Sequence, residues 1–382
     1  MALAANDADV VIVGAGPAGS ALAIMLGQAG VNTTLLDRSR FPRDKTCGEG
    51  LMPAGVQVLD ELGVSLARFP SLRAVSYRVP RAGSAMGEFM DGKTGRGVRR
   101  LEFDRLLAER AAATPNVDAR YGCEATGVEV WPSHIEVKTA AGTLTARFAV
   151  GADGIRSRVA RWVGWSRPPR GQHRYALVGH AESPAHGADW VLVTLLDGCE
   201  VYTAPTGPDE LLIAVLGSKS GLRADGEPVR EAYARHVRAA HPDVRIHADA
   251  AIHGAGPFWV RPSTVADRRV ALIGDAAGFL DPLTGDGMSD ALVAARKLAQ
   301  LVASEVPDPL RAYRRWEAGQ WRRRIFVNRL ALTLTGSSLL ARRALRRLRQ
   351  RPSTLSRLLE VNDGSRSLWS LSLRDWSTLA GV

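Results

Sequence analysis

Three places in the chain put glycine and acidic residues directly after an apolar strand, a pattern that binds phosphate-containing ligands. They are Gly14-Ala15-Gly16-Pro17-Ala18-Gly19, Asp153-Gly154 and Gly274-Asp275. Glycine lets backbone N–H groups approach a phosphate closely, and a carboxylate accepts hydrogen bonds from ribose hydroxyls. Because open α/β sheets bind ligands at the C-terminal ends of their strands, the three turns predict one nucleotide site built from distant segments.

The first turn carries the full pattern of a dinucleotide fingerprint. Residues 10–13 form an uninterrupted run of β-branched side chains, as expected for a strand covered on both faces. Gly14 allows the tight turn, Gly16 leaves room for a pyrophosphate, and Gly19 lets the following helix lie close to the strand. The next strand ends at Asp37, about twenty residues on, where a carboxylate can bind a ribose 2′-hydroxyl. We therefore predict dinucleotide binding.

The composition describes a folded protein and excludes several other classes. The chain has 382 residues, of which 46% are hydrophobic and 23% charged, so it can bury a large core. Cys47, Cys123 and Cys199 are far apart and suggest neither a disulfide framework nor a metal site, which predicts a reducing cytoplasm. The start of the chain does not read as a signal peptide, and the apolar run at 325–341 is too polar for a transmembrane segment.

The net charge of +11 is concentrated at one end of the sequence. Residues 310–382 contain sixteen arginines, four acidic residues and no lysine, so the rest of the chain is close to neutral. The simplest interpretation is a solvated helical face, and the alternative is a surface for anionic lipid or an acidic carrier. We do not expect nucleic acid as a partner. The predicted location is therefore the cytoplasm, with peripheral membrane association as the alternative.

A further loop contains side chains suited to redox or acid–base chemistry. Lys45-Thr46-Cys47-Gly48-Glu49-Gly50-Leu51 follows Phe41-Pro42-Arg43 closely. The order and spacing of the three turns resemble those of the flavoprotein monooxygenase and geranylgeranyl reductase superfamily, in which FAD lies extended across one Rossmann-like domain. The loop resembles the Cys-Gly-containing loop of the geranylgeranyl reductase-like branch of that superfamily. The resemblance covers residues 10–62, 100–103, 150–159 and 270–301.

The resemblance and the strand pattern together predict the fold class. We expect an α/β protein with a Rossmann-like FAD-binding domain, an inserted antiparallel-sheet substrate domain and a helical C-terminal region. The predicted boundaries are 1–72, 98–170 and 252–303 for the discontinuous FAD-binding domain, 73–97 and 171–251 for the substrate domain, and 304–382 for the basic helical region.

The resemblance also implies a role for each matching residue. Asp37 would hold the adenosine ribose, Arg100 would reach the FAD phosphate or ribityl region, and Asp275 would bind the ribityl chain or the pyrophosphate side. Residues 285–288 would bring backbone N–H groups to the flavin, whose reduced form is negatively charged at that edge. Cys47 and Gly48 would lie beside the flavin ring, although a small structural loop is the simpler interpretation. The predicted cofactor-binding residues are Gly14, Gly16, Pro17, Ala18, Gly19, Asp37, Arg38, Cys47, Gly48, Arg100, Asp153, Gly154, Gly274, Asp275, Pro282, Gly285, Asp286, Gly287 and Met288, and the predicted catalytic residues are Glu49 and Tyr202.

The leading prediction for function is an NAD(P)H-dependent FAD monooxygenase, a hydroxylase or epoxidase that uses O₂ on an apolar, secondary-metabolite-like substrate. The sequence has one dinucleotide fingerprint, so NAD(P)H would bind transiently as the reductant, and Asp153-Gly154 is either a site shared between the two cofactors or a structural turn. The first alternative is a geranylgeranyl reductase-like enzyme that reduces or desaturates a C=C bond. The second is a non-redox cyclase or binding module in which FAD is structural.

One stretch of the predicted substrate domain separates the subtypes. Residues 200–205, Glu-Val-Tyr-Thr-Ala-Pro, align with the Trp-x-Trp-x-Ile-Pro segment of related halogenases but contain neither tryptophan. Halogenation is therefore not expected. The stretch also lacks the aromatic-rich version found in lipid reductases, which argues against a polyprenyl substrate. Strands around Trp190, Leu195 and Tyr202 suggest a hydrophobic substrate or, equally, an ordinary sheet core.

Overall fold

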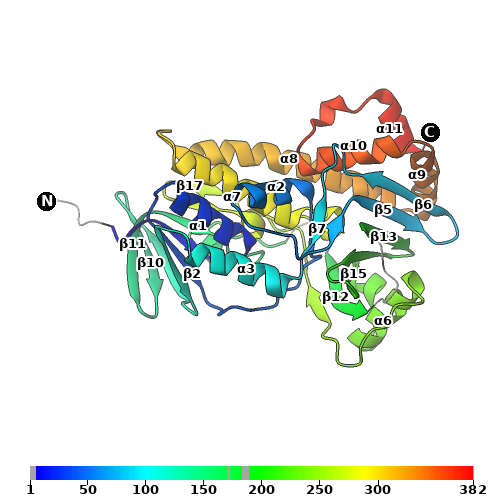
Figure 1. Cartoon of the computed structure of the whole chain (residues 1–382), viewed down its shortest axis with the longest axis horizontal. Helices are drawn as coiled ribbons and strands as arrows, with labels where there is room; N and C mark the ends of the chain where they lie inside the picture. Colours follow the sequence, from blue (N-terminus) through cyan, green and yellow to red (C-terminus); the bar gives the residue numbers. More distant parts are fainter. Residues whose placement is uncertain (1–5, 170–172, 183–188, 382) are drawn as a thin grey trace.

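An eight-stranded sheet carries the first glycine turn at its centre (Figure 1). Five of its strands run parallel, in the order β18-β11-β1-β2-β8. Val10, Val11 and Ile12 in β1 have no exposed surface, as expected for a strand covered on both faces. The strands are β1 (Ala8–Val13), β2 (Thr33–Asp37), β8 (Val117–Tyr121), β9 (Ala125–Val130), β10 (Ile135–Thr139), β11 (Gly142–Gly151), β17 (Ala266–Asp267) and β18 (Val270–Leu272).

The structure is a computed structural model that describes residues 6–169, 173–182 and 189–381. No signal peptide is predicted at the start of the sequence, and residues 1–5 of that stretch lie outside the described residues. No helix among the described residues is both long enough and apolar enough to cross a membrane.

Helices pack on the strands of this sheet and on one another. They are α1 (Pro17–Gln28), α2 (Pro53–Glu61), α3 (Arg100–Ala112), α4 (Arg158–Trp162) and α7 (Gly287–Val302). Helix α1 packs against both α3 and α7. The spacing of Leu106, Leu107 and Arg110 predicts a helix over 103–113, whereas α3 begins at Arg100, three residues earlier. The backbone N–H of Arg100 donates to Oε1 of Glu49 at 2.8 Å, so a distant acid helps to start this helix.

A second, seven-stranded sheet lies beside the first (Figure 1). Its strands are β5 (Ala74–Val79), β6 (Gly83–Glu88), β12 (Arg174–Glu182), β13 (Trp190–Leu196), β14 (Cys199–Pro205), β15 (Glu210–Ser218) and β16 (His253–Ala255). The expected antiparallel pairing holds throughout except between β5 and β13, which are parallel. This exception arises because the β5–β6 hairpin comes from an earlier segment and joins the sheet at its edge. Helices α5 (Lys219–Leu222) and α6 (Val229–Ala240) pack against β15.

A small sheet joins the two larger parts of the molecule. It contains β3 (Gly50–Leu51), β4 (Ser71–Leu72) and β7 (Gly95–Gly97). Strand β3 directly follows the loop at 47–49, so pairing between β3 and β7 fixes one end of that loop.

The C-terminal region is helical, as predicted. Its helices are α8 (Pro309–Thr335), α9 (Ser338–Gln350), α10 (Pro352–Asp363) and α11 (Leu373–Ala380), with short 3-10 turns at Gly274–Ala277, Pro282–Thr284 and Leu368–Ser370 elsewhere in the last third of the chain. Helix α8 lies along α7, whereas α9 and α10 pack on strand β6 of the second sheet. The C-terminal helices therefore bridge both sheets. The division of the chain at the predicted domain boundaries stays a prediction.

Candidate active site

One large cavity of about 1210 Å³ lies between the two sheets. Every predicted cofactor-binding residue except Gly19 lines it, and so do both predicted catalytic residues, Glu49 and Tyr202. The three glycine-acid turns come from β1, β11 and β18, which are neighbours in the parallel sheet. The structure thus brings together at one edge the segments that the sequence places far apart.

The three glycines of the first turn differ in what a side chain would meet there. Gly14 has φ of +108°, and a Cβ there would lie 2.5 Å from the carbonyl oxygen of Ala152. A Cβ on Gly19 would lie 1.8 Å from the carbonyl oxygen of Gly14, so α1 packs directly on the turn. A Cβ on Gly16 would meet only Arg43, at 3.8 Å. Gly16 therefore leaves the cavity open, while Gly14 and Gly19 keep the turn tight.

Asp37 at the end of β2 is largely committed to ordering this turn. Its Oδ2 accepts from the Ala15 N–H and its Oδ1 from the Ser39 N–H, both at 2.8 Å. Arg43 lies 3.7 Å from the same Oδ2 and lines the cavity. A ribose hydroxyl would have to use the remaining acceptor capacity of this carboxylate. The ribose contact of Asp37 stays a prediction. The side chain of Arg38 is exposed, and its contact with the cofactor also stays a prediction.

Arg100 lines the cavity but its guanidinium is not free. Its Nε and Nη2 each donate to one oxygen of Asp104 at 2.7 Å, and both side chains are buried. Arg43 adds a second cation 3.0 Å from Asp104. The predicted contact of Arg100 with the FAD phosphate or ribityl region therefore remains untested, and the geometry shows a fixed ion pair beside the cavity.

Two acids on the cavity wall keep oxygen atoms without a protein partner. Asp153 uses Oδ2 to accept from the N–H groups of Arg158 and Val159 at the start of α4, whereas its buried Oδ1 has no partner among the described residues. Asp275 has no hydrogen bond to its carboxylate within the described chain, and burial raises its pKa while Lys45 opposes that shift. Such acceptors suit hydroxyl groups of a bound ligand.

The start of α7 forms another part of the wall. Gly285 has φ of +74°, and Gly287 and Met288 open the helix, whose first N–H groups lack intrahelical acceptors. Asp286 precedes it, is buried, and accepts from Nδ2 of Asn362. Burial raises the pKa of Asp286 well above its usual range, and the nearby Asp290 adds to the shift.

The loop at 47–50 closes the same end of the cavity. Cys47 lines the cavity and is partly exposed, and desolvation is the largest cause of its raised thiol pKa. The ring of Tyr202 packs under the loop: a Cβ on Gly50 would lie 2.2 Å from its hydroxyl oxygen, and one on Gly48 3.7 Å from its ring. The Tyr202 hydroxyl is buried without a partner among the described residues, and burial raises its pKa.

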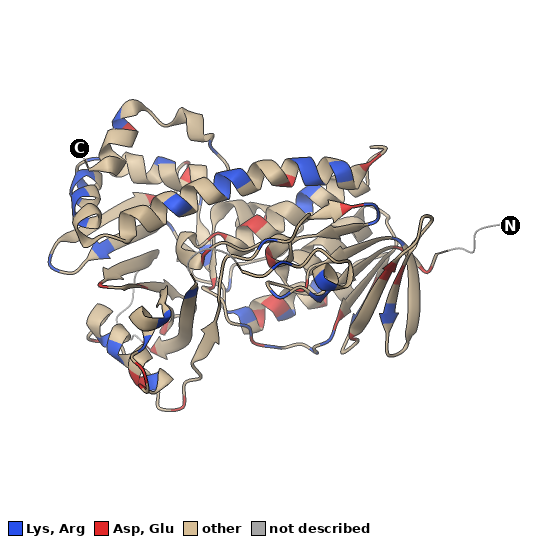
Figure 2. Cartoon of the chain, turned by 180° about the vertical axis from the view of Figure 1, so that it is seen from behind, with Lys and Arg blue, Asp and Glu red and all other residues tan. Residues whose placement is uncertain are grey.

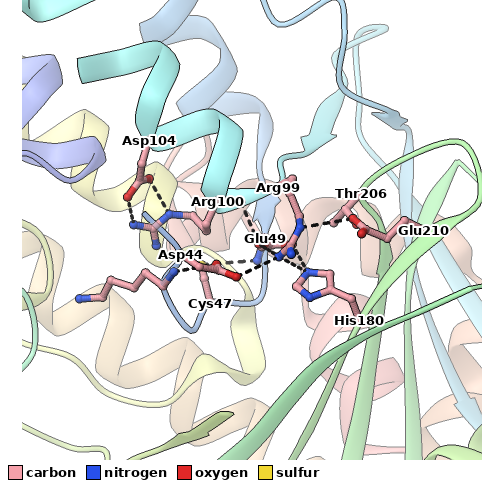
Figure 3. Close-up of polar contacts among 10 residues, drawn as sticks. Asp44, Cys47, Glu49, Arg99, Arg100, Asp104, His180, Thr206 and Glu210 are labelled. Carbon is pink, nitrogen blue, oxygen red and sulfur yellow. Dashed lines mark hydrogen bonds and ion pairs between the residues drawn. The ribbon is translucent and has the colours of Figure 1, made fainter. Parts of the chain in front are cut away.

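Glu49 sits at the centre of a polar cluster that joins three segments (Figure 3). Its backbone φ is +55°, a conformation that non-glycine residues rarely adopt. Besides the Arg100 N–H, its carboxylate lies 3.4 Å from Nη1 of Arg99 and 2.8 Å from Nε2 of His180. His180 and Arg99 also lie 2.8 Å apart. The cluster connects the loop, the start of α3 and strand β12.

Arg99 and His180 were not among the residues that the sequence singled out. His180 lies in an ordinary strand pattern, and Arg99 precedes a helix whose start was placed too late. No sequence motif links either residue to Glu49, because His180 is 131 residues and Arg99 is 50 residues away from it in the sequence.

The wall opposite the glycine turns is apolar. Ala176 and Val178 of β12, Ala214 of β15, and the paired rings of Phe258 and Phe279 line it. The sequence suggested a hydrophobic surface around Trp190 and Leu195, but neither lines this cavity. These two residues lie in β13, and Tyr202 of β14 is the one residue of that predicted group on the cavity wall.

The geometry therefore fits an extended dinucleotide whose rings lie at opposite ends of the cavity. Gly16 leaves the space that a pyrophosphate needs, Asp153 and Asp275 offer unpartnered oxygens, and α7 directs its N-terminus at the far end.

Comparison with known proteins agrees with this geometry. The family model described as "FAD binding domain" matches residues 7–316. Menaquinone reductase of Mycobacterium tuberculosis is 31% identical over 353 residues, covering 86% of this chain and 85% of the relative. Digeranylgeranylglycerophospholipid reductase 1 of Methanococcoides burtonii is 27% identical over 327 residues, covering 78% of this chain and 75% of the relative.

A solved flavoprotein/dehydrogenase from Cytophaga hutchinsonii has the same fold. Its TM-score is 0.80 at 20% identity, and the match covers 95% of this chain and 94% of that chain. The fold, the site geometry and the family match lead to one conclusion: the chain belongs to the FAD-binding-domain family and is an FAD-dependent oxidoreductase.

Proposed function

We propose that the protein reduces a carbon–carbon double bond in an apolar, isoprenoid-type substrate, with NAD(P)H as the source of electrons. Among the sequence predictions this is the first alternative, and it now takes precedence over monooxygenation. FAD, when bound and reduced, supplies a hydride to one carbon of the double bond. The protein must then deliver a proton to the other carbon.

The Cys47 thiol carries this proposal. It lines the cavity in the loop that the flavin ring is expected to approach, and its raised pKa keeps it protonated at neutral pH. A protonated, partly exposed thiol can donate a proton to carbon and be reprotonated by solvent. Oxygen transfer to a substrate does not require protonation of a substrate carbon.

The names of the relatives support the same reaction class. Both are reductases, and one is named for a digeranylgeranyl lipid and the other for menaquinone. The apolar wall formed by Ala176, Val178, Phe258 and Phe279 suits a hydrocarbon chain. Because the sequence has one dinucleotide fingerprint, NAD(P)H would enter the same cavity for a short time rather than bind a domain of its own.

The polar cluster around Glu49 would position the loop rather than react. The Glu49 carboxylate is occupied by Arg99, the Arg100 N–H and His180, and it holds a backbone conformation that is otherwise unfavourable. Tyr202 would support the loop from below, because its hydroxyl is buried against Gly50. The predicted catalytic roles of these two residues remain untested.

Monooxygenation remains the second candidate because residues 200–205 lack the aromatic-rich sequence of lipid reductases. In that case the apolar wall of the cavity would limit the access of water to the activated oxygen. The expected location for either reaction is the cytoplasm, with access to apolar substrate at a membrane surface.

The experiment that tests the proposal is anaerobic turnover. Protein loaded with FAD is reduced, mixed without O₂ with a geranylgeranyl lipid that contains no quinone, and flavin reoxidation and product mass are measured. A product that gains two hydrogen atoms as the flavin reoxidises is the expected result. A product that forms only with O₂ and gains one oxygen atom would establish monooxygenation instead.

A further inference from the structure

Helix α9 presents arginine and leucine to solvent on one face. Its sequence is SLLARRALRRLRQ, which contains no acidic residue. Ala341, Ala344, Leu345 and Leu348 are buried, and the exposed leucine and arginine side chains are Leu339, Leu340, Arg342, Arg343, Arg346, Arg347 and Arg349. At 3.6 residues per turn, Leu339 falls between Arg343 and Arg346 on the exposed face. This face is therefore both basic and apolar.

The arginines of this face are not neutralised by the protein. In the described part of the last three helices, the ion pairs are Arg357–Asp375 and Arg366–Glu360, and none involves an α9 arginine. Figure 2 shows the basic residues gathered on this helix, next to the C-terminus at one end of the molecule. Five unpaired guanidinium groups on three turns create a strong local positive potential.

Large apolar side chains are exposed at the same end. Trp369 is 92% exposed in the turn before α11, and Leu373, the first residue of α11, is 88% exposed. Helix α11 packs against α9, with Gly381 beside Arg343. Exposed leucine and tryptophan on α11, the turn before it and the adjoining α9, next to unpaired arginines, fit an interaction surface better than apolar residues scattered singly do.

We propose that this end of the molecule docks on an anionic lipid bilayer. The docking surface consists of Leu339, Leu340, Arg342, Arg343, Arg346, Arg347, Arg349, Trp369 and Leu373. Guanidinium groups pair with headgroup phosphates, while leucine and tryptophan enter the boundary between headgroups and acyl chains. A nucleic acid would satisfy the arginines but leave the two leucines of α9 in water, so the combination favours lipid. This inference concerns binding alone and stands whether or not the proposed reaction is correct.

The first test removes four positive charges from the docking surface and compares the effect on vesicle binding with that of removing four positive charges elsewhere. The variant R342Q/R343Q/R346Q/R347Q is compared with R238Q/R311Q/R315Q/R322Q, whose arginines are also exposed and free of ion pairs among the described residues. Binding is measured by co-sedimentation with phosphatidylcholine vesicles, with and without phosphatidylglycerol. We expect the holoprotein to bind only the anionic vesicles, the first variant to bind about tenfold or more weakly, and the second to bind as the parent does.

The second test addresses the apolar part of the docking surface. L339S/W369S/L373S keeps all the charges, so binding through charge alone would leave its affinity unchanged. We expect at least about threefold weaker binding, most evident at raised salt, where screening weakens the arginine contribution. Equal binding to neutral vesicles, equal loss in both charge variants, or unchanged affinity of the triple variant would overturn the proposal. Binding to duplex DNA that competes with the vesicles and does not depend on the leucines would assign the surface to nucleic acid instead.

Discussion

At the scale of single residues, two cysteines line the cavity, so substitution of one can serve as the control for substitution of the other. Cys47 lies in the loop near Tyr202, whereas Cys123 follows β8 and donates its N–H to the Asp37 carbonyl at the predicted adenosine end. We predict that Cys47→Ala slows anaerobic C=C reduction about a hundredfold, which is the usual contribution of a general acid. Cys123→Ala should leave the rate unchanged.

The readout is the rate of flavin reoxidation by substrate, with FAD content measured in each variant. Loss of FAD from Cys47→Ala would assign the thiol to cofactor binding rather than proton transfer. An unchanged rate with full FAD would contradict the proposed donor and assign the proton to another group or to water.

Most residues of the site could be predicted from the sequence because they belong to local motifs. Gly14, Gly16, Asp37 and Asp275 each follow a strand at a fixed offset, so their neighbours reveal them. His180 and Asn362 could not be found in this way, since their partners Glu49 and Asp286 are distant in sequence and meet only in the folded chain.

Asp286 yields a prediction about pH. Its folded-state pKa is raised by burial, so the unfolded chain releases its proton at a lower pH than the folded chain does. Folding stability is therefore lost as the pH rises above the unfolded value of about 3.9. Asp286→Asn removes this cost while its amide oxygen still accepts from Asn362. We expect a gain in unfolding free energy near pH 7 and none near pH 4, measured by denaturant titration, and an equal gain at both pH values would contradict the assignment.

At the scale of elements, the β1–α1 turn separates packing from ligand space. Gly19→Ala would place a Cβ against the backbone oxygen of Gly14, which neither side can move away from cheaply, whereas Gly16→Ala meets only a flexible Arg43 side chain. We predict that Gly19→Ala costs about 3 kcal/mol or more in stability. Gly16→Ala should fold normally but bind FAD more weakly, because its methyl group enters the cavity.

Thermal melting and FAD titration of the two variants measure the two effects separately. A Gly16→Ala protein with unchanged FAD affinity would show that the pyrophosphate does not pass this glycine.

The elements that sequence patterns misjudged are those fixed by distant partners. Helix α3 starts at Arg100 because Glu49, 51 residues upstream, accepts its N–H. Strand β5 pairs in parallel with β13, which is more than a hundred residues away. This direction could not be predicted, because the alternation of apolar and polar residues carries no information about strand direction. The apolar patterns of residues 135–139 and 190–196 predict strands with the bounds that β10 and β13 have, because the burial of these strands follows their own sequence.

At the scale of the whole molecule, the C-terminal helices complete the cavity. The family match ends at residue 316, yet later side chains contact the segment between β18 and α7 and the first turn of α7. Asn328 donates to the carbonyl of Asp281, Arg323 pairs with Asp290 at 3.2 Å, and Asn362 donates to the carbonyl of Thr284 and to Asp286. The region that carries the docking surface is thus connected through α10 to the predicted flavin end of the cavity.

This connection predicts that Asn362→Ala affects the cofactor as well as stability. The substitution leaves the Asp286 carboxylate buried without its amide donor, which should cost about 1–3 kcal/mol, and it frees the start of α7, so FAD should dissociate faster and its absorbance spectrum should shift. Asn116→Ala is the control, because Asn116 donates to the carbonyl of Gly27 at the opposite edge of the parallel sheet. It should lower stability without changing the flavin spectrum. If the double variant Asn362→Ala/Asp286→Ala lost as much stability as the two single variants combined, the two side chains would not be coupled, and the C-terminal region would cover the site without holding it.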